Sequence, residues 1–213
     1  MRNILIVVDM QKDFVTGALA SAEAQAILPE VMAKISEYDR AGKEIIFMRD
    51  THGEDYMQTN EGKHLPVPHC IKGTDGWQIC SELTDGVTSE YKTVDKPTFG
   101  FLGWKDVLAS ETADGSDLDI EMIGVCTDIC VVSNALILKA LYPEATVRVD
   151  AGCCAGVTPE SAPELNFACA SDIDFSSIKS PCTYPPDLMP LAERCTRLSF
   201  LPLSRVLPPL TIL

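Results

Sequence analysis

The sequence predicts an α/β fold with a central parallel sheet. Short, continuously apolar runs, which are typical of buried strands, alternate along the chain with segments that carry a helical pattern. Several of these runs end at a charged residue, as residues 3–8 do at Asp9. Because strands of this kind must be covered by helices on both faces of their sheet, we expect a three-layer domain.

The elements of this fold follow one another in order, with predicted strands at residues 3–8, 44–48, 91–95, 119–123 and 146–150. A helix is expected over residues 22–41, because Pro29 lies near a helix start and Gly42 lies just past its end. Residues 102–109 predict a short helix, and residues 51–76 a long polar loop.

The stretch after the fourth strand, GVCTDIC at residues 124–130, leads into a predicted helix over residues 128–141. Thr127 or Asp128 is expected to cap this helix. Cys130 then falls in its first turn, where the helix dipole and the unpaired N–H groups lower the pKa of a thiol and favour a nucleophile. The alternative is that Cys130 is a small buried hydrophobic residue, as most free cysteines are.

Length, charge and cysteine use limit the class of protein. The chain of 213 residues fits one domain, and its net charge of −14 argues against nucleic acid and anionic membranes as partners. No apolar run is long enough to span a membrane. Residues 4–8 are apolar, but Asp9, Lys12 and Asp13 follow at once, so no signal peptide is expected. The nine cysteines lack a framework spacing, which indicates reduced thiols in a cytoplasmic protein.

Polar or reactive residues follow four of the predicted strands. They are Asp9, Asp50, Lys96 and the turn at residues 126–130. In parallel sheets ligands bind beyond these carboxyl ends, so the convergence favours a catalytic role for Cys130. Asp9 could take the thiol proton and pass one to a leaving amine, and Lys96 could hold the thiolate. The alternatives are that Asp9 caps the following turn and that Lys96 is a solvated surface lysine.

A second cluster lies in the long polar loop. Asp50 and His52 are two residues apart, so both face one way on an extended segment. Glu61, His64 and His69 follow. Carboxylates together with histidines suit a divalent metal such as zinc, and a solvated polar loop is the alternative.

Six segments carry motifs that run collinearly over residues 1–161: IVVDMQKDF (6–14), MRDTH (48–52), LPVPHCIKGTDGW (65–77), DKPTFGFL (95–102), GVCTDICVVSNAL (124–136) and VDAGCCAGVTPES (149–161). In this combination the chain resembles the isochorismatase-like cysteine hydrolases, and among them the nicotinamidases. The resemblance implies a Rossmann-like domain over residues 1–161 with a parallel six-stranded sheet. It also implies hydrolysis of nicotinamide to nicotinate and ammonia through a cysteine thioester.

The resemblance assigns the catalytic roles to Asp9, Lys96 and Cys130. It places the oxyanion hole on the backbone N–H groups of Cys126 and Cys130, with a cis peptide bond just before Cys126. Phe14 would line the substrate pocket, together with Tyr56 and Phe99 in positions that the motif match supports less directly.

The same resemblance implies a metal ion, most simply zinc, that binds the pyridine nitrogen of nicotinamide. The commonest form of the family has a further histidine shortly after the first, where this chain has Tyr56 and Met57. A branch of the family uses a glutamate instead, and His64 is the rival of Glu61 for this position. The expected ligands are Asp50, His52, Glu61 and His69.

The end of the chain departs from the family after Ser161. Residues 162–213 hold 8 of the 14 prolines and carry no sustained period, with at most a short helix at 191–201. We therefore expect an atypical, Pro-rich tail that is disordered or frame-shifted.

Two classes of function follow. The first is an amidohydrolase whose substrate is the small molecule nicotinamide. No nucleic-acid or membrane partner is expected, and a homo-oligomer is consistent with this class. Another small carboxamide or an isochorismatase-like reaction is the alternative within enzymes. The second class is a catalytically impaired product of the aberrant end, acting at most as a binding or assembly subunit.

Overall fold

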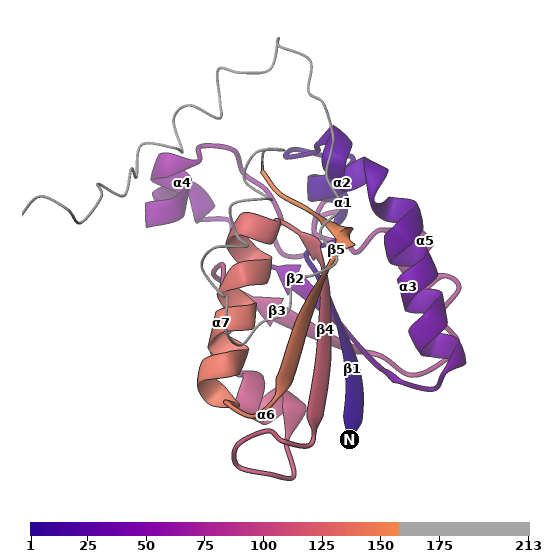
Figure 1. Cartoon of the computed structure of the whole chain (residues 1–213). Coiled ribbons are helices and arrows are strands. Elements are labelled where there is room, and N and C mark those ends of the chain that lie inside the picture. The colour runs from indigo at the N-terminus through magenta and orange to yellow at the C-terminus, as the bar shows by residue number, and fades with distance from the viewer. Residues whose placement is uncertain (158–213) are drawn as a thin grey trace, which may run out of the picture. The chain divides into compact units, whose positions relative to one another are not determined.

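The structure, a computed structural model, describes residues 1–157. Its centre is a five-stranded parallel sheet with the strand order β3-β2-β1-β4-β5 (Figure 1). The strands are β1 (Arg2–Val8), β2 (Glu44–Asp50), β3 (Lys92–Lys96), β4 (Leu118–Val125) and β5 (Thr146–Ala155). Each overlaps a strand predicted from the sequence, so the predicted parallel α/β fold is confirmed. The sixth strand implied by the resemblance is not among the described residues.

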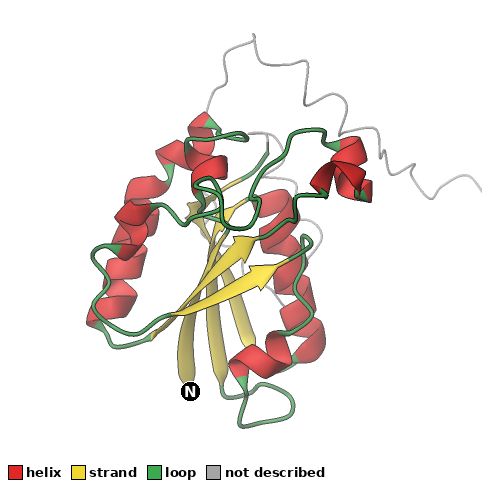
Figure 2. Cartoon of the chain, turned by 180° about the vertical axis from the view of Figure 1, so that it is seen from behind, coloured by secondary structure: helices red, strands yellow, loops and turns green. Residues whose placement is uncertain are grey.

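Helices cover both faces of the sheet, as the two opposite views show (Figures 1 and 2). One face is covered by α1 (Lys12–Val15), α2 (Ala22–Ala26), α3 (Leu28–Arg40) and α5 (Ser81–Thr84). The other face is covered by α6 (Trp104–Leu108) and α7 (Val132–Leu141). The three layers are those expected for a sheet whose strands are apolar throughout.

The central strand β1 supplies both cores. Ile4, Ile6 and Val8 pack into the core beneath α6 and α7, whereas Leu5 and Val7 pack into the core beneath α3. Because alternate side chains of a strand point to opposite faces, a strand between two helical layers must be apolar at every position. This explains why residues 3–8 form a continuous apolar run.

A close approach between β1 and β4 requires glycine next to the site. Val8 pairs with Gly124, which has φ +114°. A Cβ atom at this position would lie 2.1 Å from the Val8 carbonyl oxygen. Glycine therefore lets β4 approach β1 at the point where Asp9 follows.

Two helical predictions are corrected. The helix expected over residues 22–41 is divided into α2 and α3 at Ile27, with Pro29 in the first turn of α3 as predicted. The segment expected as a loop over residues 51–76 contains two short helices, η1 (Tyr56–Gln58) and α4 (Asn60–His64). The side chain of Thr59 caps α4 by accepting a hydrogen bond from Gly62 N, a local signal that the polar composition concealed.

The helix expected over residues 128–141 begins with a π-helical turn, η2 (Thr127–Val131), before α7. The expected cap is wrong, because Cys126 precedes the turn and no side chain caps it. Asp128 accepts instead from Val157 N at 3.0 Å, and the buried Thr127 hydroxyl has no hydrogen-bond partner within residues 1–157.

The predicted tail at 162–213, with its short helix at 191–201, lies outside the described residues. No helix within residues 1–157 is long and apolar enough to cross a membrane.

Candidate active site

Four side chains that can react or carry charge meet at the carboxyl edge of the sheet. Asp9 follows β1, Asp50 ends β2, Lys96 ends β3, and Cys130 lies in η2 beyond β4. The carboxyl ends of parallel strands share one edge, which is why the sequence predicts this convergence. All four side chains are buried: Asp9 and Lys96 are 0% exposed, Asp50 is 4% exposed and Cys130 is 7% exposed.

The Lys96 ammonium is the centre of this group. Its Nζ lies 2.8 Å from Asp9 Oδ2, 3.1 Å from Asp50 Oδ1 and 3.5 Å from Cys130 Sγ. Burial lowers the pKa of the ammonium, but the negative charge of these neighbours outweighs burial and raises the pKa above its usual value. Lys96 is therefore a buried cation, and the alternative of a solvated surface lysine is excluded.

Asp9 is a carboxylate with spare acceptor capacity. Its Oδ2 contacts the Lys96 ammonium, while its Oδ1 has no hydrogen-bond partner in the part of the chain that the structure describes. The side chain therefore does not cap the following turn, which was the alternative reading. Burial raises the pKa of Asp9 to about 6, against the lowering effect of Lys96. At neutral pH such a group is ionised and can still take up and return a proton.

Cys130 does not have the lowered pKa expected at a helix start. Burial, followed by the charge of Asp9, raises the pKa of the thiol well above its usual value, and Lys96 opposes the shift only in part. The expected lowering of this pKa is wrong, because burial of the thiol outweighs the effect of the helix start.

The turn that carries Cys130 has the backbone features implied by the resemblance. The peptide bond between Val125 and Cys126 is cis. The Cys126 carbonyl accepts hydrogen bonds from Ile129 N at 3.2 Å and Val131 N at 3.1 Å, so these two N–H groups are engaged within the turn. The oxyanion hole on the N–H groups of Cys126 and Cys130 stays a prediction.

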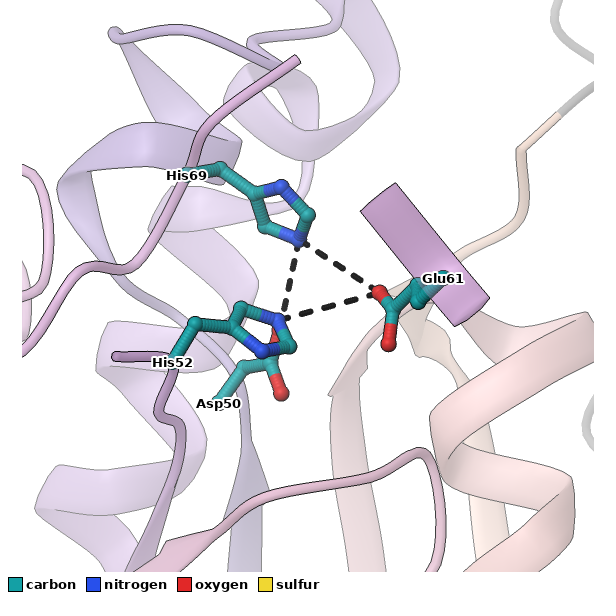
Figure 3. Close-up of side chains that lie close together, drawn as sticks. All are labelled: Asp50, His52, Glu61 and His69. Carbon is teal, nitrogen blue, oxygen red and sulfur yellow. Dashed lines mark hydrogen bonds and ion pairs between the residues drawn. The ribbon is translucent and has the colours of Figure 1, made fainter. Parts of the chain in front are cut away.

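A candidate metal centre lies beside this group (Figure 3). Asp50 Oδ2 is 2.9 Å from His52 Nε2 and 3.4 Å from His69 Nε2. Glu61 Oε1, on α4, is 3.7 Å from His52 Nε2 and 3.8 Å from His69 Nε2. One ligand atom from each of these four residues lies within 4.8 Å of the others. Two imidazoles and two carboxylates in this arrangement suit a divalent transition metal such as zinc.

Hydrogen bonds to the backbone orient the two histidines toward this centre. His69 Nδ1 lies 2.8 Å from the Val67 carbonyl, so Nδ1 donates and Nε2 is left to face the cluster. His52 N donates to the Cys70 carbonyl, which pairs the two histidine-bearing segments. Asp13 Oδ2 accepts from Cys70 N at 2.8 Å and holds the residue after His69.

His64, the rival fourth ligand, lies away from the cluster. It is exposed, and its Nδ1 lies 2.8 Å from the Asn60 carbonyl one turn earlier in α4. The structure brings Glu61, not His64, to the other three candidate ligands.

The structure places two of the three expected substrate residues against the metal centre. Phe14 meets the His69 ring edge-on at 5.6 Å. Tyr56 packs on His52 at 4.7 Å and on His69 at 5.0 Å, and its hydroxyl donates to the Leu65 carbonyl at 2.9 Å. Phe99 is 45% exposed on the loop that follows β3.

One buried residue that the sequence reasoning missed is Gln11. Its Nε2 donates to the Asp50 carbonyl at 2.9 Å and to the Trp77 carbonyl at 2.8 Å, and its Oε1 accepts from Asp50 N at 2.7 Å. Gln11 thus fixes the backbone of Asp50 and ties the segment around Trp77 to it. An isolated glutamine carries no periodic signal, and only its place between Asp9 and Phe14 in one motif could have pointed to it.

Comparisons with known proteins bear on this site. A family model described as the isochorismatase domain matches residues 3–168. A nicotinamidase of Saccharomyces cerevisiae is 26% identical over 188 residues, which cover 68% of this chain and 85% of that protein. A pyrazinamidase/nicotinamidase from Streptococcus mutans is 26% identical, with a TM-score of 0.69 over 81% of this chain and 99% of that one. A pyrazinamidase of Pyrococcus horikoshii, solved in complex with zinc, is 26% identical, with a TM-score of 0.64 over 82% and 98%.

Proposed function

The chain belongs to the isochorismatase family, and we propose that it is an amidohydrolase that converts nicotinamide to nicotinate and ammonia. The bond that it cleaves is a non-peptide C–N bond, as in the nicotinamidases to which the chain is similar. The observation that carries the proposal is the position of Asp50. Its Oδ1 contacts Lys96, whose Nζ lies 3.5 Å from Cys130 Sγ, and its Oδ2 contacts the two histidines. Asp50 therefore stands between the thiol and the candidate metal centre, where one small ligand can meet both.

In the proposed reaction Asp9 is the base and Cys130 is the nucleophile. Asp9 takes the thiol proton as the sulfur attacks the amide carbon, and then gives this proton to the amide nitrogen. The C–N bond breaks, ammonia leaves and a thioester remains. Asp9 next takes a proton from water as the water oxygen attacks the thioester. The C–S bond breaks, the proton on Asp9 returns to the sulfur of Cys130, and the nicotinic acid leaves as its carboxylate by releasing its remaining proton to solvent.

Lys96 supports these steps by charge. Its ammonium lies against both the carboxylate of Asp9 and the sulfur of Cys130, so it stabilises the thiolate that forms during attack. The oxyanion of each tetrahedral intermediate is assigned to the backbone N–H groups of Cys126 and Cys130.

The proposed metal ligands are Asp50, His52, Glu61 and His69, and zinc is the ion named for the Pyrococcus horikoshii relative. When bound, this ion supplies a Lewis acid for which a pyridine ring nitrogen is a suitable ligand. Phe14 and Tyr56 pack on the histidines and are assigned to the walls of the ring pocket. Phe99 is assigned to the rim, on the loop after Lys96.

The test is ammonia release by the purified full-length chain loaded with zinc. We expect nicotinamide to yield equal amounts of ammonia and nicotinate. Benzamide has the same amide but no ring nitrogen, so it is the matched control and should react far more slowly. A chain that is folded and zinc-loaded but leaves nicotinamide unchanged would refute the proposal, and turnover of isochorismate by the same sample would favour the alternative reaction.

A further inference from the structure

A fully buried asparagine on α7 makes four hydrogen bonds beside the proposed nucleophile. Asn134 Nδ2 donates to the Cys130 carbonyl at 2.8 Å and to the Phe99 carbonyl at 3.0 Å. Its Oδ1 accepts from Phe101 N at 2.9 Å and from Trp104 Nε1 at 3.1 Å. Both amide hydrogens and both acceptor positions are thus used, and the side chain is held in one orientation.

These bonds connect two segments that follow strands which are not neighbours in the sheet. Lys96 ends β3 at one edge of the sheet, and β2 and β1 lie between β3 and β4, the strand that leads to Cys130. Lys96 Nζ nevertheless lies 3.5 Å from Cys130 Sγ. Because β3 and β4 are not neighbours in the sheet, no direct ladder of hydrogen bonds between them sets this distance.

The loop at residues 97–103 makes few other hydrogen bonds to the described part of the chain. Its remaining hydrogen bonds within the described chain are local, from Thr98 Oγ1 to the Gly100 carbonyl and from the first turn of α6 to the Gly103 carbonyl. The loop packs tightly on α7, since a Cβ atom at Gly100 would lie 2.5 Å from Ile137 Cδ1. Asn134 therefore supplies the polar contacts that lock the loop after Lys96 onto the helix after Cys130.

We propose that Asn134 is a positioning residue whose Nδ2 donors hold the Lys96 loop and the Cys130 turn in the relative position that thioester formation needs. The inference rests on the proposed function, but it concerns a residue that the catalytic steps do not use. The Nδ2 donor and the Oδ1 acceptor of Asn134 connect different segments. The donor half links the loop directly to the Cys130 carbonyl, whereas the acceptor half links only the loop and α6 to α7.

The test compares Asn134→Asp with Trp104→Phe in the zinc-loaded, full-length protein. The first variant keeps Oδ1, which accepts from Phe101 N and Trp104 Nε1, but replaces the Nδ2 donor to the two carbonyls with an oxygen. The second loses only the indole N–H bond to Oδ1 and leaves the donors in place. We expect Asn134→Asp to lower kcat about 10- to 100-fold with little change in KM, because a displacement of about 1 Å in a reacting group costs rates of this order. Trp104→Phe should stay within about twofold of the wild-type kcat, although both variants melt at a lower temperature.

A second measurement does not depend on turnover. Iodoacetamide labelling of Cys130 at one fixed pH, followed by fragment mass mapping, should be slowed in Asn134→Asp and unchanged in Trp104→Phe, because the thiolate loses its cation. Equal kcat and equal labelling in the two variants would overturn the proposal. If wild-type protein hydrolyses no carboxamide, the proposed function fails and the labelling comparison alone decides the role of Asn134.

Asn134→Ser covers the case in which the aspartate variant does not fold. A serine hydroxyl on a helix can donate to the carbonyl four residues earlier, so it keeps a bond to Cys130 and loses the bonds to the loop. A reduced kcat with slowed labelling supports the proposal. Wild-type values for both would overturn it, because they would show that the link to the loop is not needed.

Discussion

The two sides of the site are held by different kinds of backbone. Asp9, Asp50 and Lys96 come from the ends of neighbouring parallel strands, and Asp50 lies opposite Lys96 in the register of β2 and β3. The other candidate metal ligands belong to the connection between β2 and β3: His52, Glu61 and His69. Strand ends are spaced by a ladder of hydrogen bonds, whereas the connection depends on contacts between its own segments.

The two sides also differ in how their charges are balanced. On the strand side one ammonium lies between two carboxylates and offsets one of their two negative charges. On the loop side Glu61 faces the histidines from 3.7 and 3.8 Å, and burial raises the pKa of its carboxyl. We infer that the strand side keeps its geometry without an ion and that the loop side needs one.

The largest effect is expected at the nucleophile. Cys130→Ala should abolish thioester chemistry, so turnover should fall to background while the melting temperature and zinc content stay near the wild-type values. The measurement is ammonia release together with metal analysis of the same sample. Substantial remaining activity would move the nucleophile to Cys126 or remove the covalent step.

The next largest effect is expected at Asp9. Asp9→Asn removes the base and the acid in one change, and we expect kcat to fall by about 10²-fold or more. Zinc content should not change, because Asp9 belongs to the strand side and contacts Lys96 rather than the metal ligands. A variant that loses zinc along with activity would break the division between the two sides.

A smaller effect, on metal affinity, separates two residues of one short helix. Glu61→Gln weakens a direct ligand, so we expect zinc affinity to fall by at least about 10- to 100-fold, which is the range for the loss of an outer-shell partner of a metal ligand. His64→Gln changes an exposed residue three positions later and is the matched control. Competition with a chromophoric chelator measures both. Affinity that survives the Glu61 change but falls with the His64 change would reassign the ligand.

The smallest effect is the pH dependence, which follows from burial of Asp9. Because burial raises the pKa of Asp9 to about 6, the group is a competent base above that pH and is protonated below it. In zinc-saturated protein we expect kcat/KM to fall below about pH 6, by about tenfold per unit. The stability contribution has the opposite sign: it is present below the unfolded pKa and is lost as the pH rises through about 6. A rate profile that stays flat down to pH 5 would show that Asp9 is not the titrating base.

The strand side could be predicted from the sequence, and the loop side only in part. Asp9 and Lys96 stand directly after apolar runs, so the rule for parallel sheets brings them to one edge. His52 and His69 were recognised as ligand types, but their meeting depends on the pairing of His52 with the segment after His69 and on the Asp13 contact to Cys70 N. Polar contacts of that kind have no period along the chain.

Burial and the hydrogen-bond networks of buried amides are the other features that could not be predicted from the sequence. The pKa of Cys130 was expected to be lowered by the helix start, and packing around the thiol raises it instead. Gln11 and Asn134 are both 0% exposed and were not singled out, because their importance lies in partners that are distant along the chain. The choice between Glu61 and His64 depends on which face of α4 is directed at the other ligands. The sequence predicts a loop at α4, so it could not give this orientation.

The most direct test of a cysteine hydrolase is to trap its intermediate. Zinc-loaded protein mixed with nicotinamide and quenched in acid within the first turnovers should carry a nicotinoyl group, and fragment mass spectra should place it on Cys130. Asp9→Asn, which is slow in both half-reactions, provides the comparison sample. A nicotinoyl group on another cysteine, or full turnover with no acylated protein at any time, would contradict the account.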